Sequence, residues 1–136
     1  MLTVKTYLAP SSIHGIGLFA AENIPADSLV WQFNEHIDRI YSEDIFLEVC
    51  RDTNACTLPH LLNCSYKRGG RYFYLTDNAR FMNHSETNDN VAHVLSKDKM
   101  EAVRQISRGE ELLCNYLSYS DPDDFHIRSI RDKILK

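Results

Sequence analysis

The segments Arg80-Phe81-Met82-Asn83-His84-Ser85 and Gly109-Glu110-Glu111-Leu112-Leu113-Cys114-Asn115-Tyr116 decide how this chain is interpreted. The first sets an amide and an imidazole side by side after an aromatic run, which gathers several hydrogen-bonding groups at one place. The second has the pattern of a tight turn followed by a β-strand that ends on a tyrosine. Taken singly, neither is specific, because an Asn-His pair is more often a satisfied turn and a strand-end tyrosine usually lies in the core or at its rim.

Short β-type runs dominate both ends of the chain, and clusters of Gly, Pro, Asn, Asp and Ser separate them. This pattern is typical of short strands joined by tight turns, so the expected fold class is mainly β with short helices. The runs cover residues 4–8, 17–20, 29–33, 72–75, 91–94, 100–106 and 112–116. The sequence His14-Gly15-Ile16-Gly17 is expected to form a turn, because glycine permits backbone conformations closed to other residues.

A helix is predicted over residues 42–51, followed by an irregular, partly helical insert over 52–70. Ser42 is a suitable N-cap, and Glu43 and Asp44 complement the helix dipole in the first turn. Ile45 and Val49 offer the face that this helix is expected to bury.

A second helix is predicted in the segment 117–136. Asp121 is expected to cap it, with Pro122 at the first helical position. Apolar residues then recur at helical spacing, at Ile127, Ile130 and Ile134. We expect this tail helix to close the core of the domain, and a partner-binding helix is the less favoured alternative.

The composition indicates one soluble domain. The chain has 136 residues, of which 43% are hydrophobic and 25% charged. Its formal charge of −4 argues against direct binding to nucleic acid. The N-terminus lacks a signal-peptide pattern and no apolar run could span a membrane, so an intracellular location, cytoplasmic or nuclear, is expected. The four cysteines form no CxxC pair, so no metal site is expected.

Three motifs in order along the chain resemble the SET-domain family of protein lysine methyltransferases. They are His14-Gly15-Ile16-Gly17-Leu18-Phe19-Ala20 and the two segments quoted first, and the resemblance covers about residues 4–116. A lone Gly-x-Gly is weak, but an RFxNHS segment followed by GEEL and a tyrosine is highly specific. The resemblance implies a SET-domain fold, with small curved β-sheets around a C-terminal pseudoknot and a C-terminal helix. It divides the chain into a SET domain over 1–116, with a variable insert at about 42–70, and the segment 117–136.

The same resemblance implies S-adenosylmethionine as the cofactor. In the family, the backbone around the Gly-x-Gly turn and the Asn-His pair bind this molecule. The corresponding cofactor-binding residues here are His14, Gly15, Ile16, Gly17, Leu18, Phe19, Asn83 and His84.

The tyrosine that ends the GEEL strand lies beside the methyl-transfer channel in the family, which nominates Tyr116 as the catalytic residue. Methyl transfer needs a neutral amine, whereas a free lysine with a pKa of about 10.4 is almost fully charged at pH 7. An apolar, aromatic channel and a neighbouring sulfonium charge both favour the neutral form. Tyr72 and Tyr74 are candidate channel walls, and strand alternation puts them on one face, which is either the channel or the core.

The chain departs from the family near its end. Many members bind zinc through a cysteine after Asn-His-Ser and three more beyond the final tyrosine, but here Glu86 follows Ser85 and no cysteine follows Cys114. Residues 117–136 are therefore expected to complete the site, with Tyr119 or Phe125 over the adenine or the channel mouth. Cys114 also stands where the family commonly has Phe or Tyr, which leaves room in the channel and favours multiple methylation.

The predicted function is S-adenosylmethionine-dependent methyl transfer to the side-chain amine of a protein lysine, on a histone-like or other basic substrate. One alternative is a catalytically degenerate SET domain that acts as a protein-interaction module. Another is methylation of something other than a protein lysine.

Overall fold

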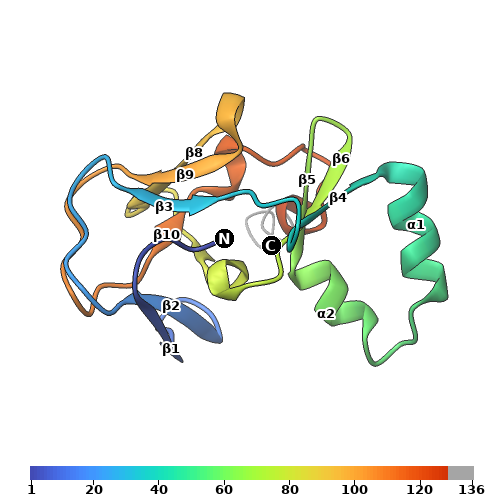
Figure 1. Cartoon of the computed structure of the whole chain (residues 1–136). Coiled ribbons are helices and arrows are strands. Elements are labelled where there is room, and N and C mark those ends of the chain that lie inside the picture. The colour runs from blue at the N-terminus through green and yellow to red at the C-terminus, as the bar shows by residue number, and fades with distance from the viewer. Residues whose placement is uncertain (129–136) are drawn as a thin grey trace.

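The structure is a computed structural model and describes residues 1–128, which form three small sheets and several short helices (Figure 1). The first sheet pairs β1 (Thr6–Pro10) with β2 (Ile16–Ala20). The second has five strands in the order β3 (Leu29–Gln32), β9 (Lys99–Ala102), β8 (Val91–Val94), β10 (Leu113–Cys114) and β7 (Asn83–His84). The third has the order β4 (Arg39–Ser42), β6 (Arg71–Tyr74) and β5 (Ser65–Arg68). The expected mainly β class is thereby confirmed.

The helices are short, and the two α-helices lie beside the third sheet. They are α1 (Glu43–Asp52), α2 (Leu58–Asn63) and the 3₁₀ turns η1 (Asn78–Phe81), η2 (Leu95–Lys97) and η3 (Tyr116–Ser118). Among residues 1–128, no helix is long and apolar enough to cross a bilayer.

Helix α1 occupies the predicted position, and the Ser42 hydroxyl accepts a hydrogen bond from the Ile45 amide as an N-cap should. The prediction of its buried face was wrong. Ile45 is exposed, whereas Phe46 is buried because its ring stacks on Tyr72 of β6, with centroids 3.9 Å apart.

The end of the insert is more regular than expected. Residues 65–68 form strand β5, which pairs antiparallel with β6 and places Tyr66 opposite Phe73 and Lys67 opposite Tyr72. The Tyr66 and Phe73 rings stack on the core side, 5.1 Å apart.

Strand β10, from the segment Gly109–Tyr116, pairs with β7, from the segment Arg80–Ser85, and so brings these two segments together. Strand β10 lies between β7 and β8 and is parallel to both, with Leu113 opposite Asn83 and Cys114 opposite His84. The connection from β7 to β8 therefore crosses β10, which is the threaded arrangement that the resemblance implies and an exception to the usual unthreaded connections. Buried Asn90 holds this crossing, because its amide donates to the Glu111 carbonyl (2.8 Å) and accepts from the Leu113 amide (2.9 Å).

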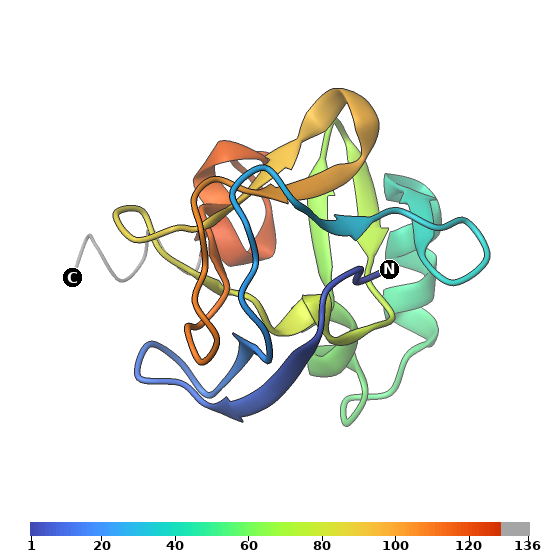
Figure 2. The same ribbon diagram turned by 60° about the vertical axis from the view of Figure 1, so that its left-hand side comes forward.

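One hydrophobic core lies between the sheets. Its most buried members come from β2, β3, β6 and the strand-like segments near residues 106 and 112, namely Leu18, Val30, Trp31, Phe73, Ile106 and Leu112. In Figures 1 and 2, η1 lies between the β1–β2 hairpin and helix α2, so the Arg80–Ser85 segment faces both.

The tail begins its helix later than predicted. Residues 122 and 123 lie in a turn and helical structure starts at residue 125. The Asp121 carboxylate does not cap the helix but accepts hydrogen bonds from the Gly69 and Gly70 amides, each at 2.8 Å. Asp124 serves as the cap, since its carboxylate accepts from the His126 amide at 2.7 Å. Ile127 is buried as expected, and the predicted positions Ile130 and Ile134 lie outside the described residues.

Candidate active site

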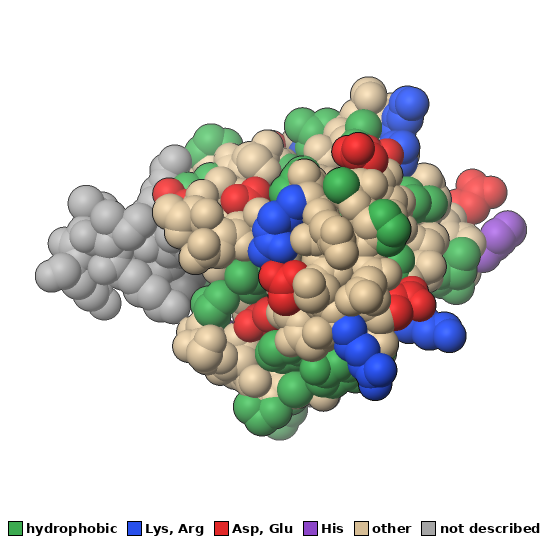
Figure 3. Space-filling view, turned by 90° about the vertical axis from the view of Figure 1, so that its left-hand side faces the viewer, with side chains coloured by type: hydrophobic (Ala, Val, Ile, Leu, Met, Phe, Trp, Pro, Cys, Tyr) green, Lys and Arg blue, Asp and Glu red, His purple; other side chains and the backbone are tan. Residues whose placement is uncertain are grey.

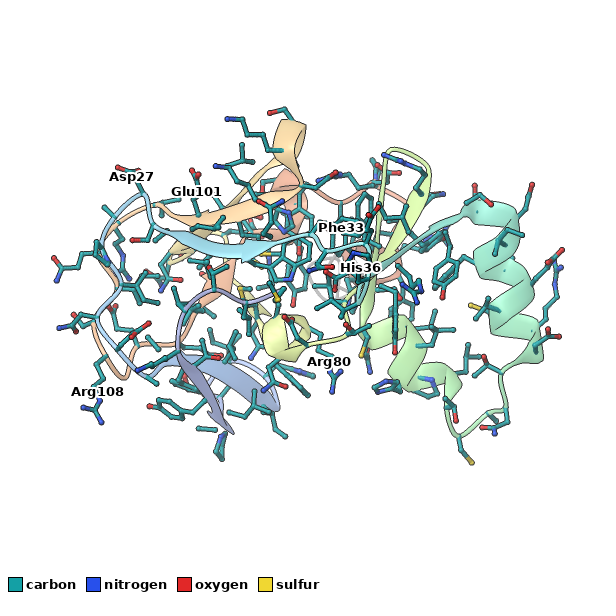
Figure 4. The ribbon with its side chains drawn as sticks, in the orientation of Figure 1. Asp27, Phe33, His36, Arg80, Glu101 and Arg108 are labelled. Carbon is teal, nitrogen blue, oxygen red and sulfur yellow. The ribbon has the colours of Figure 1, made fainter. Side chains whose placement is uncertain are left out.

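A cleft of about 840 Å³ lies where the β1–β2 turn, η1, β7, α2 and the tail meet. Its volume is typical of a site for a small molecule. Several predicted cofactor-binding residues line it, namely His14, Gly15, Ile16, Asn83, His84 and Phe125. Arg80 also lines it, and Figure 4 shows this residue extending from η1 on the side of α2.

The structure does not bring the remainder of the first motif to the cleft. Leu18 is fully buried in the core, and its carbonyl accepts a hydrogen bond from the Leu112 amide at 2.7 Å. Phe19 stacks on Tyr7, with centroids 5.6 Å apart. Gly17 faces Glu111 instead. The backbone from Gly17 to Phe19 is paired with β1, so only the turn before it remains open to a ligand.

Asn83 ties the first turn to strand β7. Its Nδ2 donates to the His14 carbonyl and to the Glu111 carboxylate, each at 2.9 Å. Both hydrogens of the amide have acceptors, so the oxygen Oδ1 is the group of this side chain left for a ligand.

His84 offers a hydrogen-bond donor to the cleft. Its Nδ1 accepts from the Tyr116 amide at 3.1 Å, so in the neutral ring Nε2 carries the hydrogen. Nε2 is buried and meets no hydrogen-bond partner among residues 1–128, and the nearest carboxylate oxygen, on Glu86, is 3.8 Å away. A buried donor without a partner costs roughly 1–3 kcal/mol, so a ligand acceptor at this point would be favoured.

Tyr116 stands at the inner end of the cleft. Its hydroxyl donates to the Met82 carbonyl at 2.6 Å, and its ring lies 5.1 Å from that of His84. Burial raises the pKa of this phenol above its ordinary value, so it is neutral at physiological pH.

Beside Tyr116 a second, narrow cavity of about 30 Å³ opens. It has room for about one water-sized group. Tyr116, Tyr119, Tyr66 and Cys114 are among its lining residues. The Tyr66 and Tyr119 rings meet edge to face at 5.0 Å, and the Tyr119 hydroxyl lies 3.7 Å from the Cys114 sulfur. Burial raises the pKa of the Cys114 thiol to about 12, so this wall carries no charge at neutral pH.

Tyr72 and Tyr74, the predicted channel walls, line neither of these two cavities. Tyr72 stacks on Phe46 because strand alternation turns it away from the core, towards α1. Tyr66, from strand β5, lines the narrow cavity instead. The sequence pattern did not single it out, because its strand lies in the insert that was expected to be irregular.

The sequence did not single out Asn63, Cys64 or His126, which line both cavities. The His126 Nε2 lies 3.2 Å from the carbonyl oxygens of Leu62 and Ser65, so it carries the hydrogen and ties the tail to the insert. No local pattern marks such a residue, because its partners are backbone carbonyls about 60 positions away.

No group of three or more His, Cys, Asp or Glu side chains within residues 1–128 has the arrangement of a metal site. Charges do not gather by sign on the face shown in Figure 3, where Lys and Arg alternate with Asp and Glu. Several acidic residues near the site are engaged within the chain. Asp123 pairs with the buried Lys67 at 2.6 Å, and Glu110 pairs with Arg104 at 3.0 Å.

The fold and the two cavities, which share Tyr116 as a lining residue, point to a class of protein. Residues 15–117 match the family model described as "SET domain". The chain belongs to the SET-domain family, whose members include methyltransferases.

Two curated relatives are both described as "Histone-lysine N-methyltransferase 2D", one from Homo sapiens and one from Mus musculus. Each is 30% identical over 135 residues, which is 90% of this chain but 2% of the relative. The chain thus spans only a small part of their length.

Solved structures share the fold. One, titled "ctPRC2 in an autoinhibited conformation bound to S-adenosylmethionine", matches with a TM-score of 0.66 and 21% identity over 96% of this chain and 17% of that chain. Another, of the Chaetomium thermophilum polycomb repressive complex 2, matches with a TM-score of 0.62 and 22% identity over 90% of this chain and 16% of that chain.

Proposed function

We propose that this chain transfers a methyl group from S-adenosylmethionine to the side-chain amine of a protein lysine. The observation that carries the proposal is the meeting of two cavities at Tyr116, a cleft of about 840 Å³ and a narrow cavity of about 30 Å³. The cleft suits a cofactor of nucleoside size. The narrow cavity suits the end of an extended amine.

The cleft residues fit such a cofactor. The Nε2 hydrogen of His84 is a buried donor that lacks an acceptor among residues 1–128, and Oδ1 of Asn83 is an acceptor. Gly15 has a positive φ of 50° and leaves the turn backbone uncovered by a side chain. Phe125 would cover the adenine from the tail. When bound, S-adenosylmethionine supplies an electrophilic methyl group on a positively charged sulfur.

The residues around the narrow cavity would prepare the amine. The uncharged aromatic wall of Tyr66, Tyr116 and Tyr119 disfavours an ammonium group that has lost its water, which lowers the pKa of a lysine entering it. Tyr116 would orient the amine in line with the methyl group, and holding two reactants in line supplies several kcal/mol of a typical rate enhancement.

The number of methyl groups depends on the space beside Cys114. This residue is small, but the Tyr119 hydroxyl reaches to 3.7 Å from its sulfur and occupies part of the room. We propose that the chain adds more than one methyl group, because the cysteine side chain leaves space that an aromatic ring at position 114 would fill.

The substrate we propose is a basic protein segment such as a histone-like tail, in keeping with the names of the relatives. Of the carboxylates near the cleft, Glu86 lines it and its side chain is 51% exposed. It is therefore available to attract a cation, whereas Asp121 and Asp124 are occupied by amides of the chain.

The test is mass spectrometry of basic proteins incubated with the chain and S-adenosylmethionine, beside the variant Tyr116→Phe. We expect one or more additions of a methyl group on lysine, and a loss of at least about tenfold in rate for the variant. Tyr7→Phe is the matched control, because Tyr7 is exposed and lies outside both cavities. Equal rates for the Tyr116 variant and the unsubstituted chain would remove Tyr116 from the mechanism. A chain that binds no S-adenosylmethionine in a calorimetric titration would overturn the proposed function.

A further inference from the structure

Glu111, the second glutamate of the GEEL segment, contacts the other two motifs at once. One carboxylate oxygen, Oε1, accepts from Asn83 Nδ2 at 2.9 Å. The other, Oε2, accepts from the Ser11 hydroxyl at 3.0 Å. Glu111 itself does not line the cleft.

The contact with Ser11 organises the cofactor turn from one side. The Ser11 oxygen also accepts from the amides of Ile13 (3.0 Å) and His14 (3.3 Å), so it holds the backbone that borders the cleft. The Asn83 amide holds the same turn from the other side, through the His14 carbonyl at 2.9 Å. The Glu111 carboxylate therefore connects both supports of the turn.

The same carboxylate explains a glycine of the first motif. A Cβ atom on Gly17 would lie 2.2 Å from Glu111 Oε1 and 2.8 Å from its Cδ, which no side chain tolerates without displacing the carboxylate. Gly17 is not among the glycines with a positive φ, so the close approach of the carboxylate, rather than backbone freedom, favours glycine here. A larger residue would have to displace the Glu111 side chain.

Glu111 also fixes the orientation of the Asn83 amide. A carboxylate accepts hydrogen bonds but cannot donate them, so the amide nitrogen must face it and Oδ1 must face away. No ion pair within residues 1–128 neutralises Glu111. A negative charge thus stands behind the turn that borders the cleft, where it would attract a cationic ligand.

We propose that Glu111 is a positioning residue of the cofactor site, which acts through Asn83 and the turn 11–15. The proposal rests on the proposed function, because it assumes that the cleft binds S-adenosylmethionine. It assigns Glu111 to cofactor affinity and not to the reacting atoms.

The experiment is a calorimetric titration of the full chain and its variants with S-adenosylmethionine, joined to kinetics at saturating cofactor. Glu111→Ala should raise Kd at least about tenfold, since hydrogen bonds to charged groups typically contribute 1.5–3 kcal/mol. The value of kcat should change less than about threefold. Glu111→Gln should weaken binding less, because its amide oxygen can still accept from Asn83.

Glu110→Ala is the matched control. This neighbouring carboxylate contacts Arg104 and the Ser107 amide and not the turn, so the variant should keep the Kd of the unsubstituted chain. If Glu111→Ala folds poorly, Ser11→Ala removes the contact with Glu111 together with those to the Ile13 and His14 amides. This variant keeps the contact between Glu111 and Asn83 and should raise Kd a few-fold, with faster hydrogen exchange at the Ile13 and His14 amides.

Two outcomes would contradict the role of Glu111, and a third would contradict the proposed function. Unchanged Kd in Glu111→Ala, or a fall in kcat at saturating cofactor with Kd unchanged, would overturn the role of Glu111. Absence of binding by the unsubstituted chain would overturn the proposed function instead, and the two failures are therefore distinguishable.

Discussion

Replacement of Asp121 by alanine should loosen the tail from the β5–β6 hairpin. The Asp121 carboxylate accepts two hydrogen bonds at 2.8 Å, from the amides of Gly69 and Gly70. A hydrogen bond to a charged group contributes about 1.5–3 kcal/mol, but these amides are exposed and water replaces the carboxylate when it is removed. The loss of docking free energy should therefore be about 1–2 kcal/mol in total, which is a factor of about 5–30 in the population of the undocked tail.

Native-state hydrogen exchange measures this population directly. The amides of His126 and Arg128 are hydrogen-bonded to Asp124 in the docked tail, and each should exchange about 5–30 times faster in Asp121→Ala. Glu48→Ala, on the exposed side of α1, is the control and should leave these amides unchanged.

A calorimetric titration with S-adenosylmethionine then tests whether residues 117–136 complete the site. If the tail covers the cofactor, the Kd for S-adenosylmethionine should rise in Asp121→Ala. The factor should be no larger than the ratio of the hydrogen-exchange rates of the variant and the unsubstituted chain. Unchanged exchange would refute the docking role of Asp121. A chain truncated at Leu117 that binds S-adenosylmethionine with an unchanged Kd would refute the inclusion of the tail in the cofactor site.

Two further predictions concern buried groups. Burial lowers the pKa of His93 to about 3, so as the pH falls the unfolded chain binds a proton at this residue before the folded chain does. The free energy of unfolding should therefore fall by up to about 2 kcal/mol between pH 7 and pH 5. Urea unfolding should show this loss; His93→Phe should reduce it, and His36→Phe, at an exposed position, should not. A loss that persists in full in His93→Phe would assign it to another group. Cys114→Phe should fill the cavity of about 30 Å³ and lower the number of methyl groups added, at a cost of about 1–3 kcal/mol in stability, whereas Cys56→Phe at an exposed position should do neither. Mass spectrometry of the product decides, and an unchanged methylation pattern would show that Cys114 does not bound the lysine space.

The residues that belong to the three motifs were the ones that the sequence could place. The three motifs predicted a turn, an Asn-His pair and a terminal tyrosine, and the structure brings His14, Asn83, His84 and Tyr116 to one cleft. The strand pattern likewise located most of the sheets, since alternation and turn residues are local signals.

The missed features depend on long-range partners. Tyr66 reaches the narrow cavity only because β5 pairs with β6, and residues 52–70 lack the alternation that would have announced a strand. Asp121 has the local pattern of a helix cap, but the amides of Gly69 and Gly70 compete for its carboxylate and the helix begins later. For Tyr66 the pairing with a neighbouring strand, and for Asp121 a contact about 50 residues away in the sequence, overrides the local preference of the chain.

The coupling between Gly17 and Glu111 suggests why the three motifs occur together. The parallel pairing of β10 with β7 brings Glu111 beside Asn83, and the antiparallel bridge between Phe19 and Glu111 brings it beside Gly17. The three motifs thus meet at one carboxylate: Glu111 accepts from the Asn83 amide, and it occupies the space beside Gly17. Substitutions at Gly17, Asn83 and Glu111 should therefore have non-additive effects. A larger residue at Gly17 would crowd the carboxylate and a change at Asn83 would remove one of its hydrogen-bond donors, and either would disturb the turn that borders the cleft. The turn that borders the cleft is therefore shaped by the segment that also carries Tyr116. Under the proposed function, this would link the geometry of cofactor binding to that of methyl transfer.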